Sequence, residues 1–311
     1  MKRIIILLIA ISLAAFNAYA AETQAQFLSS SDVLGKYLGI EIGARSSGMG
    51  NADTVLISGA EALFINPANT EPEGADNSLL LSHNSWLGDV FQETAAYSRS
   101  FSGYGVGGIG FSYINEGKID GYTTDSLGNP VATGTINPSA VIVKANYSNF
   151  LLSQLRVGLN LGFTEENIGG NTTSKEIIDL GVKYMDVIKG LSLGISAQNL
   201  GLAGSDYSVD SSIIAGLGYA LKMEKAGDLN AELDVKLPNQ NSAVIAAGIE
   251  YVYSDTLFAR IGYEGDNSDV TGLKGIRFGL GLKYQKFNID YCFEPYGDLG
   301  ASNKLSLGFN F

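Results

Sequence analysis

The feature that most constrains this chain is a strict two-residue alternation of apolar and polar side chains across its last three quarters. From Leu155 to Phe163 every odd position is apolar, and Arg156 and Asn160 fall between them. The run from Ile276 to Tyr284 repeats the pattern. Because successive side chains of a β-strand point to opposite faces, this period predicts strands with one apolar and one polar face. The chain is therefore expected to be all-β.

Fourteen such runs can be counted, and an even number is typical of single-chain bacterial barrels. Their approximate ranges are 78–86, 89–101, 104–114, 137–148, 154–165, 175–185, 190–199, 210–221, 228–236, 242–253, 256–264, 275–284, 286–295 and 303–311.

The connections between these runs alternate in length. Even-numbered strands mostly end in short turns, and odd-numbered strands mostly end in longer polar loops such as Asn115–Ile136 and Glu166–Thr173. Membrane barrels have short turns on the periplasmic side and longer loops outside, whereas the two ends of a soluble sandwich need not differ. The sequence therefore predicts an antiparallel transmembrane β-barrel of about fourteen strands over residues 78–311. A soluble secreted β-protein is the alternative.

The polar faces of these strands carry charges of both signs. A charge facing lipid near mid-membrane costs ~2–4 kcal/mol, so the polar faces are expected to point into the lumen. The charged residues expected there are Lys144, Arg156, Asp179, Lys183, Glu232, Asp234, Glu250, Arg260, Arg277 and Asp290. Of these, Glu232, Asp234, Arg277 and Asp290 are the candidate lumen wall.

The two ends of the chain indicate its destination. Lys2 and Arg3, an apolar run and the small residues Ala18 and Ala20 predict a signal peptide over residues 1–20, cut before Ala21. The last run, 303–311, alternates and ends in Phe311, which resembles the terminal strand by which outer-membrane barrels are recognised for assembly. We expect a bacterial outer-membrane protein in contact with membrane lipid.

The charge balance excludes one class of partner. The whole chain has a formal net charge of −12, and removing Lys2 and Arg3 leaves −14. Nucleic-acid binding needs clustered basic residues, so no nucleic-acid partner is expected. No later stretch has eighteen consecutive apolar residues, so the sequence predicts no transmembrane helix.

The segment before the strands, residues 21–77, is expected to form a plug inside the barrel. Its central stretch is rich in glycine, and Gly43, Gly48 and Gly50 permit backbone turns that other residues resist. The spacing of Ser58 and Glu61 predicts a capping box at the start of one short helix.

Two further plug residues are singled out. Pro67, which follows Asn66, bars the continuation of that helix. Arg45 would be enclosed by a wall that carries Glu232, Asp234 and Asp290, and a buried guanidinium must be paired. We expect such a pair to latch the plug; the alternative is an exposed arginine at the periplasmic mouth. Gly43, Arg45, Gly48, Gly50, Asn66 and Pro67 are the candidate plug or gating residues.

Enzymatic chemistry finds little support in the residues. Residues 105–110 match a dinucleotide-binding pattern, but a strand-like run follows where that motif needs a helix. His83 and Cys292 are the single histidine and the single cysteine, too few for a zinc site. We expect no enzyme activity, no cofactor and no metal.

The plug segment resembles the N-terminal signature of the PorV/PorQ family of outer-membrane proteins. The resemblance lies in Phe27–Leu28, Gly43–Arg45, Gly48–Gly50 and Asn66–Ala68, and in His83, Trp86 and Val90 of the first hairpin. Members commonly have other residues where this chain has Asn51, Ile65 and Asn69. The family is grouped with FadL-like barrels, in which an N-terminal hatch plugs fourteen strands.

The resemblance implies two functions. PorV-like members serve type IX protein secretion, with secreted proteins or machinery subunits as partners, whereas FadL-like barrels move hydrophobic small molecules across the outer membrane. At 311 residues the chain is short for a fatty-acid transporter, which places an accessory or conduit role in export slightly ahead of transport. A structural or adhesive barrel is a third class.

Overall fold

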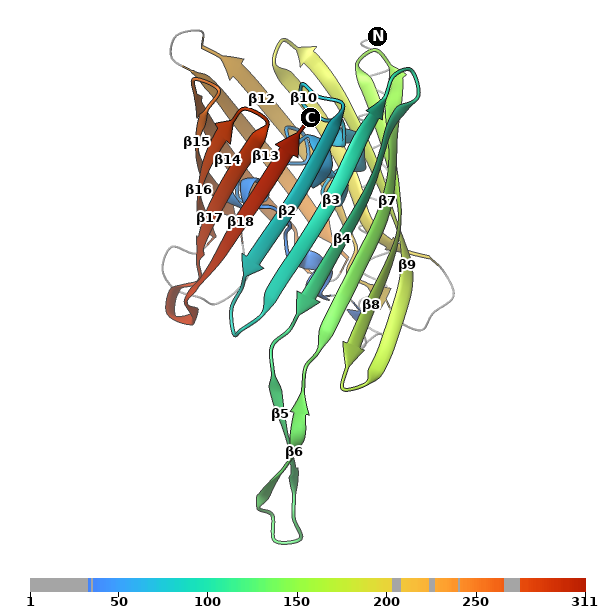
Figure 1. Cartoon of the computed structure of the whole chain (residues 1–311), viewed down its shortest axis with the longest axis vertical. Coiled ribbons are helices and arrows are strands. Elements are labelled where there is room, and N and C mark those ends of the chain that lie inside the picture. The colour runs from blue at the N-terminus through green and yellow to red at the C-terminus, as the bar shows by residue number, and fades with distance from the viewer. Residues whose placement is uncertain (1–32, 35, 203–207, 224–226, 240, 266–274) are drawn as a thin grey trace.

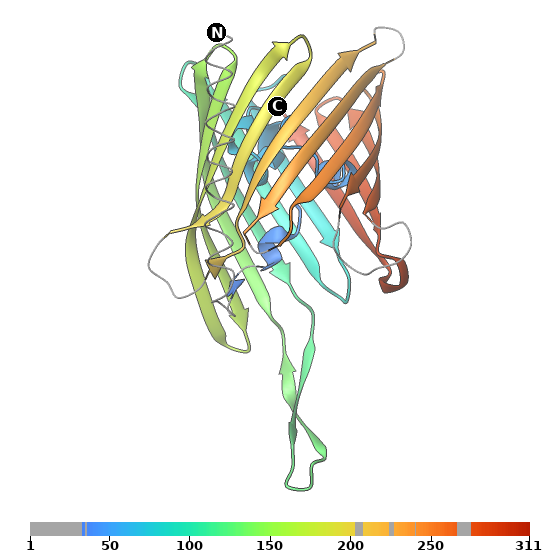
Figure 2. The ribbon, with the colours of Figure 1, turned by 180° about the vertical axis from the view of Figure 1, so that it is seen from behind.

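The fold is a closed barrel of fourteen antiparallel strands, seen in a computed structural model that describes residues 33–34, 36–202, 208–223, 227–239, 241–265 and 275–311 (Figures 1 and 2). The predicted signal peptide, residues 1–20, and residues 21–32 of the predicted plug lie outside the described residues. The last strand pairs with the first, with Leu307 opposite Leu81, and this pairing closes the wall. The predicted barrel is confirmed, and a two-sheet sandwich is excluded.

Each barrel strand overlaps one of the runs expected from the sequence. The strands are β2 (Asn77–Ser85), β3 (Phe91–Phe101), β4 (Gly105–Asn115), β7 (Ser139–Leu152), β8 (Leu155–Ile168), β9 (Asn171–Ile188), β10 (Leu191–Gly201), β12 (Ser212–Lys222), β13 (Asp228–Pro238), β14 (Val244–Tyr253), β15 (Leu257–Glu264), β16 (Ile276–Tyr284), β17 (Phe287–Pro295) and β18 (Ala301–Asn310). Neighbours in this order pair in antiparallel register around the ring.

The two faces of the wall differ as the alternation predicts. Outward side chains are large, apolar and exposed; Leu280 is 64% exposed and Ile261 is 50% exposed. All ten charged residues expected in the lumen are buried except Lys183, which is half-buried. An apolar surface of this extent needs lipid or another apolar partner. No helix among the described residues is long and apolar enough to cross a membrane.

The barrel has a turn end and a loop end. At the turn end lie the start of β2, the end of β18 and short connections such as residues 285–286. At the loop end, residues 116–138 form a hairpin of β5 (Ile119–Thr124) and β6 (Pro130–Ile136) that projects well beyond the wall (Figure 1). The long connections therefore gather at one end, as the difference between the connections after even-numbered and odd-numbered strands predicts.

Two loop predictions are wrong. The stretch Asn115–Ile136 is the β5–β6 hairpin, because its threonine, valine and isoleucine residues favour strands and the Asp125 carboxylate orders the tip by accepting from Leu127 N at 2.8 Å. Hydrogen bonds from Asn129 hold the pKa of Asp125 below its ordinary value. The stretch Glu166–Thr173 is mostly strand, since Gly169 and Gly170 both take positive φ and turn the chain in two residues.

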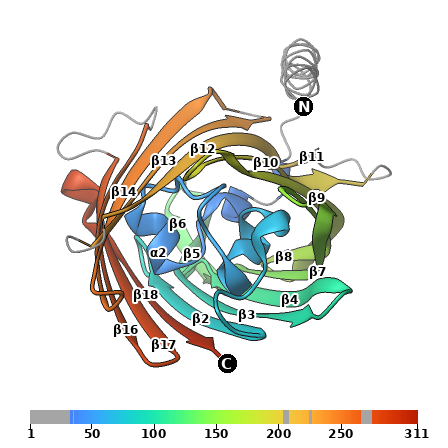
Figure 3. The same cartoon turned by 90° about the horizontal axis from the view of Figure 1, so that it is seen from above.

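The plug lies inside the ring and touches the wall on several sides (Figure 3). It comprises the 3-10 helix η1 (Lys36–Gly39), the α-helix α2 (Ala44–Gly48) and the 3-10 helices η2 (Gly59–Phe64) and η3 (Pro67–Asn69). Helix α2 contacts β15 to β18, η2 contacts β2 to β4, and η3 contacts β7 to β9. At the loop end, β1 (Val33–Leu34) pairs in parallel with β11 (Ser208–Val209), and η4 (Gly297–Leu299) precedes β18.

The capping-box prediction for the plug is wrong. Ser58 precedes η2 but makes no side-chain cap hydrogen bond. The Glu61 carboxylate instead accepts from Ser46 N at 3.2 Å and so joins η2 to α2. The five-residue helix α2 was not expected within the glycine-rich stretch; it forms because the wall packs against it on β15 to β18. Pro67 begins a new turn, as its lack of an N–H predicts.

The apolar outer face generates a stability prediction. Leu280→Arg places a charge at the middle of β16, and a charge facing lipid there should lower the free energy of unfolding by about 2–4 kcal/mol. Urea titration of the protein in lipid vesicles measures this. The matched control is Leu127→Arg at the hairpin tip, where the side chain is 85% exposed and a small change is expected. Equal losses in both variants would contradict a lipid-facing wall.

Candidate functional site

The candidate site is a cavity of about 530 Å³ on the loop-end side of the plug. Its floor is the plug segment from Leu38 to Ile42, and its rim includes Trp86 and Tyr296 at the loop-end edges of the wall. This volume falls within the range of small-molecule pockets, roughly 300–1,000 Å³.

One part of the cavity lining is apolar. The residues in it are Leu38, Ile40, Ile42, Phe64, Trp86 and Ile142. All of them except Trp86 belong to two adjoining apolar clusters. Leu38, Ile40 and Phe64 pack against the cluster that contains buried Ile142, and Phe64 also packs against the cluster that contains Ile42. The apolar part therefore joins the plug to β2, β3, β4 and β7. Trp86 Nε1 donates to Tyr296 Oη at 3.3 Å, which orients the indole ring at the rim.

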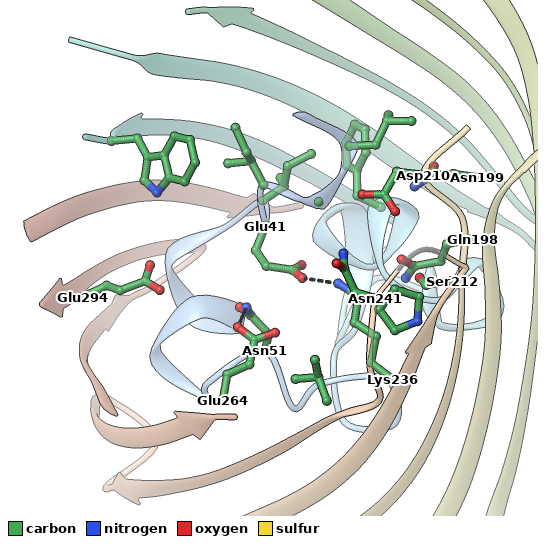
Figure 4. A pocket seen from close by; sticks show the side chains of 18 of the residues that line it. Glu41, Asn51, Gln198, Asn199, Asp210, Ser212, Lys236, Asn241, Glu264 and Glu294 are labelled. Atoms are coloured by element: carbon green, nitrogen blue, oxygen red, sulfur yellow. Dashed lines mark hydrogen bonds and ion pairs between the residues drawn. The ribbon is translucent and has the colours of Figure 1, made fainter. Parts of the chain in front are cut away.

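The rest of the lining is mostly polar and includes charged side chains of both signs. Among the described residues, the lining contains the basic Lys144, Lys236, Arg277 and Lys304 and the acidic Glu41, Asp210, Glu264 and Glu294. Glu41 of the plug and Lys236 of β13 meet across the cavity at 3.1 Å (Figure 4). Asn51 of the plug donates to Glu264 of β15 at 2.8 Å (Figure 4).

Arg45 is paired, but its partner is none of the three carboxylates expected. Its guanidinium donates to both carboxylate oxygens of Glu250 on β14 at 3.2 Å. The side chains are 19% and 2% exposed respectively, so the pair is largely enclosed. Glu250 also accepts from Arg260 at 2.6 Å, and Arg260 donates to Asp290 at 2.6 Å. Asp290 is thus joined to Arg45 only through two intervening residues, Glu250 and Arg260.

The other two expected carboxylates bind plug backbone instead. Asp234 accepts from the N–H groups of Asp53 and Thr54 at 3.1 Å. Glu232 accepts from Val55 N at 2.5 Å and from Leu56 N at 3.0 Å. Because Glu232 and Asp234 lie two positions apart on β13, they face the lumen together and hold four consecutive amides. A buried carboxylate needs hydrogen-bond donors and a buried N–H group needs an acceptor. These contacts therefore satisfy polar groups of the wall and of the plug together.

Arg277, the fourth residue of the candidate lumen wall, lines the cavity. Its guanidinium donates to Glu264 and to Glu294, the latter at 2.6 Å. Lys304 of β18 donates to Glu41 O at 2.9 Å and to Ser47 Oγ at 2.6 Å. Lys304 therefore ties the floor of the cavity to the wall.

Two plug glycines turn the chain and one permits close approach. Gly43 and Gly50 have φ of 92° and 69°, which side chains resist. Gly48 lies beside Gly279 of β16, where an added Cβ would come within 3.0 Å of the Gly279 Cα. Wall glycines have the same role: an added Cβ on Gly262 would collide with Gly50 N.

The Asn66–Pro67 element is fitted closely against the wall. Asn66 Oδ1 accepts from Ala68 N at 3.1 Å, and its Nδ2 donates to Thr54 O at 2.8 Å. An added Cβ on Gly158 would collide with Pro67, and one on Gly181 would collide with Asn66. Asn66 therefore locks the two ends of the plug loop together against β8 and β9.

Sequence reasoning missed several residues of the site. It placed Glu250 in the lumen but did not pair it with Arg45, and it gave no role to Glu41, Lys236 or Lys304. Tyr37, in the apolar cluster beside the site, was also missed; its hydroxyl shares a 2.7 Å hydrogen bond with Thr164, and burial raises its pKa to about 12. The signal that could have found the wall residues is their inward position on alternating strands.

The fold matches solved structures over nearly their whole length. The toluene transporter TbuX of Ralstonia pickettii aligns with a TM-score of 0.61 at 15% identity, over 88% of this chain and 99% of that chain. The P. putida toluene transporter TodX aligns with a TM-score of 0.60 at 14% identity, over 87% and 98%. The monoaromatic hydrocarbon channel CymD gives 0.53 at 13% identity, over 88% and 98%.

These likenesses show the fold alone, a closed fourteen-stranded antiparallel barrel like those of the toluene transporters. The sequence matches no protein-family model and no curated protein. Membership of the PorV/PorQ family is therefore not shown, and the resemblance stays a prediction from the plug and first-hairpin residues quoted above.

The Arg45–Glu250 contact generates a prediction about the plug. Arg45→Ala removes the plug partner of Glu250, whereas the contact between Glu250 and Arg260 remains. The substitution should lower the free energy of unfolding by about 1–3 kcal/mol. Proteinase K should cleave the plug faster, and a small dye should leak faster from loaded vesicles. Arg99→Ala is the control, because Arg99 is exposed and lies over the Phe101 ring. Unchanged cleavage and leak in Arg45→Ala would refute the latch.

Proposed function

We propose that this protein is an outer-membrane channel that takes up hydrophobic small molecules through the cavity above its plug. The observation that carries the proposal is the apolar part of that cavity, which lies within a barrel whose fold matches toluene transporters from end to end. Transport, the second of the two functions considered from the sequence, becomes the first. The outer-membrane location belongs to the same proposal.

The energetics suit an apolar ligand. Burying apolar surface stabilises a complex by roughly 25 cal/mol per Å² before the cost of association, and the apolar lining supplies such surface on several sides of a ligand. Because the lining is built from plug and wall together, a molecule in the cavity contacts the residues that close the lumen.

An export role receives less support. The similar structures named above are a channel and two transporters of small hydrocarbons. A polypeptide in transit would need an open lumen, and the plug is tied to β13 by four amide hydrogen bonds and to β14 by Arg45. Secretion-machinery partners are therefore not proposed.

Toluene uptake by vesicles tests the proposal. Vesicles that contain the protein should take up toluene several-fold faster than empty vesicles, because the cavity offers it an apolar path. Ile40→Glu places a charge in the apolar part of the cavity and should remove most of the gain, whereas Ile40→Leu should keep it. Uptake equal to that of empty vesicles, or unaffected by Ile40→Glu, would contradict the proposal.

A further inference from the structure

The cavity combines an apolar part with a charged part, and this division narrows the class of ligand. We propose that the preferred ligand is an amphiphile with an apolar tail and an uncharged polar group, such as a hydroxyl or an amide. This inference rests on the proposed function, because it assigns a ligand class to the same cavity.

The first step concerns net charge. Among the described residues that line the cavity, four basic side chains are balanced by four acidic ones. The basic groups are already engaged: Lys144 contacts Asp179 at 2.7 Å, Lys236 contacts Glu41 at 3.1 Å, and Arg277 contacts Glu264 and Glu294. Lys304 donates to two neutral oxygens of the plug.

An ionised ligand therefore enters a lining whose formal charges sum to zero, and each basic side chain among these residues already has an ion-pair or hydrogen-bond partner. Such a ligand would lose its hydration on entering the cavity and would also compete with ion pairs that already exist. A partly buried charge without a partner is strongly disfavoured. The balance thus selects against both carboxylate and ammonium ligands.

The second step concerns a plain hydrocarbon. The Glu41 and Lys236 side chains are 24% and 21% exposed, so their polar heads remain accessible at the cavity floor (Figure 4). A hydrocarbon lying against them would displace water without replacing its hydrogen bonds, and unsatisfied polar groups of this kind cost about 1–3 kcal/mol. A hydroxyl or amide can donate to Glu41 and accept from Lys236.

The third step is the arrangement of the two parts. Glu41 lies between Ile40 and Ile42 along the chain, and both isoleucines line the cavity. A polar contact and apolar contacts are therefore offered within a few residues of the same floor. This spacing suits one molecule with a polar end and an apolar body. In an apolar pocket, a small number of well-placed polar groups usually fixes the orientation of the ligand.

A matched series of eight-carbon probes tests the inference: octane, 1-octanol, octanoate and octylamine at neutral pH. Trp86 is the sole tryptophan of the chain and lines the cavity, so its fluorescence reports binding without a label. The protein is placed in lipid nanodiscs, and protein-free nanodiscs correct for uptake by lipid. We expect 1-octanol to bind at least tenfold more tightly than each of the other three probes.

Two single substitutions provide a charge-specific control. Glu41→Gln removes the acidic partner of Lys236 and should raise the relative affinity for octanoate about tenfold. Lys236→Gln leaves Glu41 without its basic partner and should raise the relative affinity for octylamine by a similar factor. The comparison among the four probes on the unaltered protein stands even where a variant folds poorly.

The outcomes separate this inference from the proposed function. Octane binding as tightly as 1-octanol, or an ionised probe binding more tightly, overturns the ligand class while leaving hydrophobic uptake in place. No Trp86 response to any probe, with protein-dependent toluene uptake retained, also overturns it. Loss of both the Trp86 response and toluene uptake overturns the proposed function itself.

Discussion

The structure depends on hydrogen bonds that join the charged lumen wall to the plug. Carboxylates on a lumen face need donors once water is excluded, and the plug backbone supplies them to Glu232 and Asp234. The plug, in turn, has one small apolar cluster formed by its own residues, Ile57, Ala62 and Ile65, and packs its other buried residues largely against the wall. The hydrogen bond from Arg45 to Glu250 joins the plug to the wall in the same way, here between two side chains. Barrel and plug therefore stabilise each other.

The barrel could be predicted from the sequence because it follows from local patterns. Alternation fixes which side chains face lipid, and a membrane wall admits only a closed sheet, so strand count and direction follow. The two wrong loop predictions concern segments where the surroundings constrain the residue pattern less. Residues 119–136 read as a loop because their side chains are exposed on both faces, so no alternation marks the hairpin. Gly169 and Gly170 look like loop residues but make a two-residue turn.

The site could be predicted only in part, because its contacts join residues far apart in the chain. Alternation placed the carboxylates of Asp234, Glu250 and Asp290 in the lumen, yet which one meets Arg45 depends on strand tilt and on the path of the plug. The wall glycines are a second example: Gly181 reads as an ordinary strand residue until Asn66 is found against it. The cavity is also invisible in sequence, since its lining comes from the plug and from many strands.

The proposed function rests on the plug as a fixed floor beneath the cavity, and amide hydrogen–deuterium exchange tests that floor most directly. The measurement follows residues 53–56 in the reconstituted protein. If Glu232 and Asp234 hold these amides, they should exchange as slowly as the central amides of β13. Exchange as fast as that of the exposed tip between β5 and β6 would contradict a plug held by the wall.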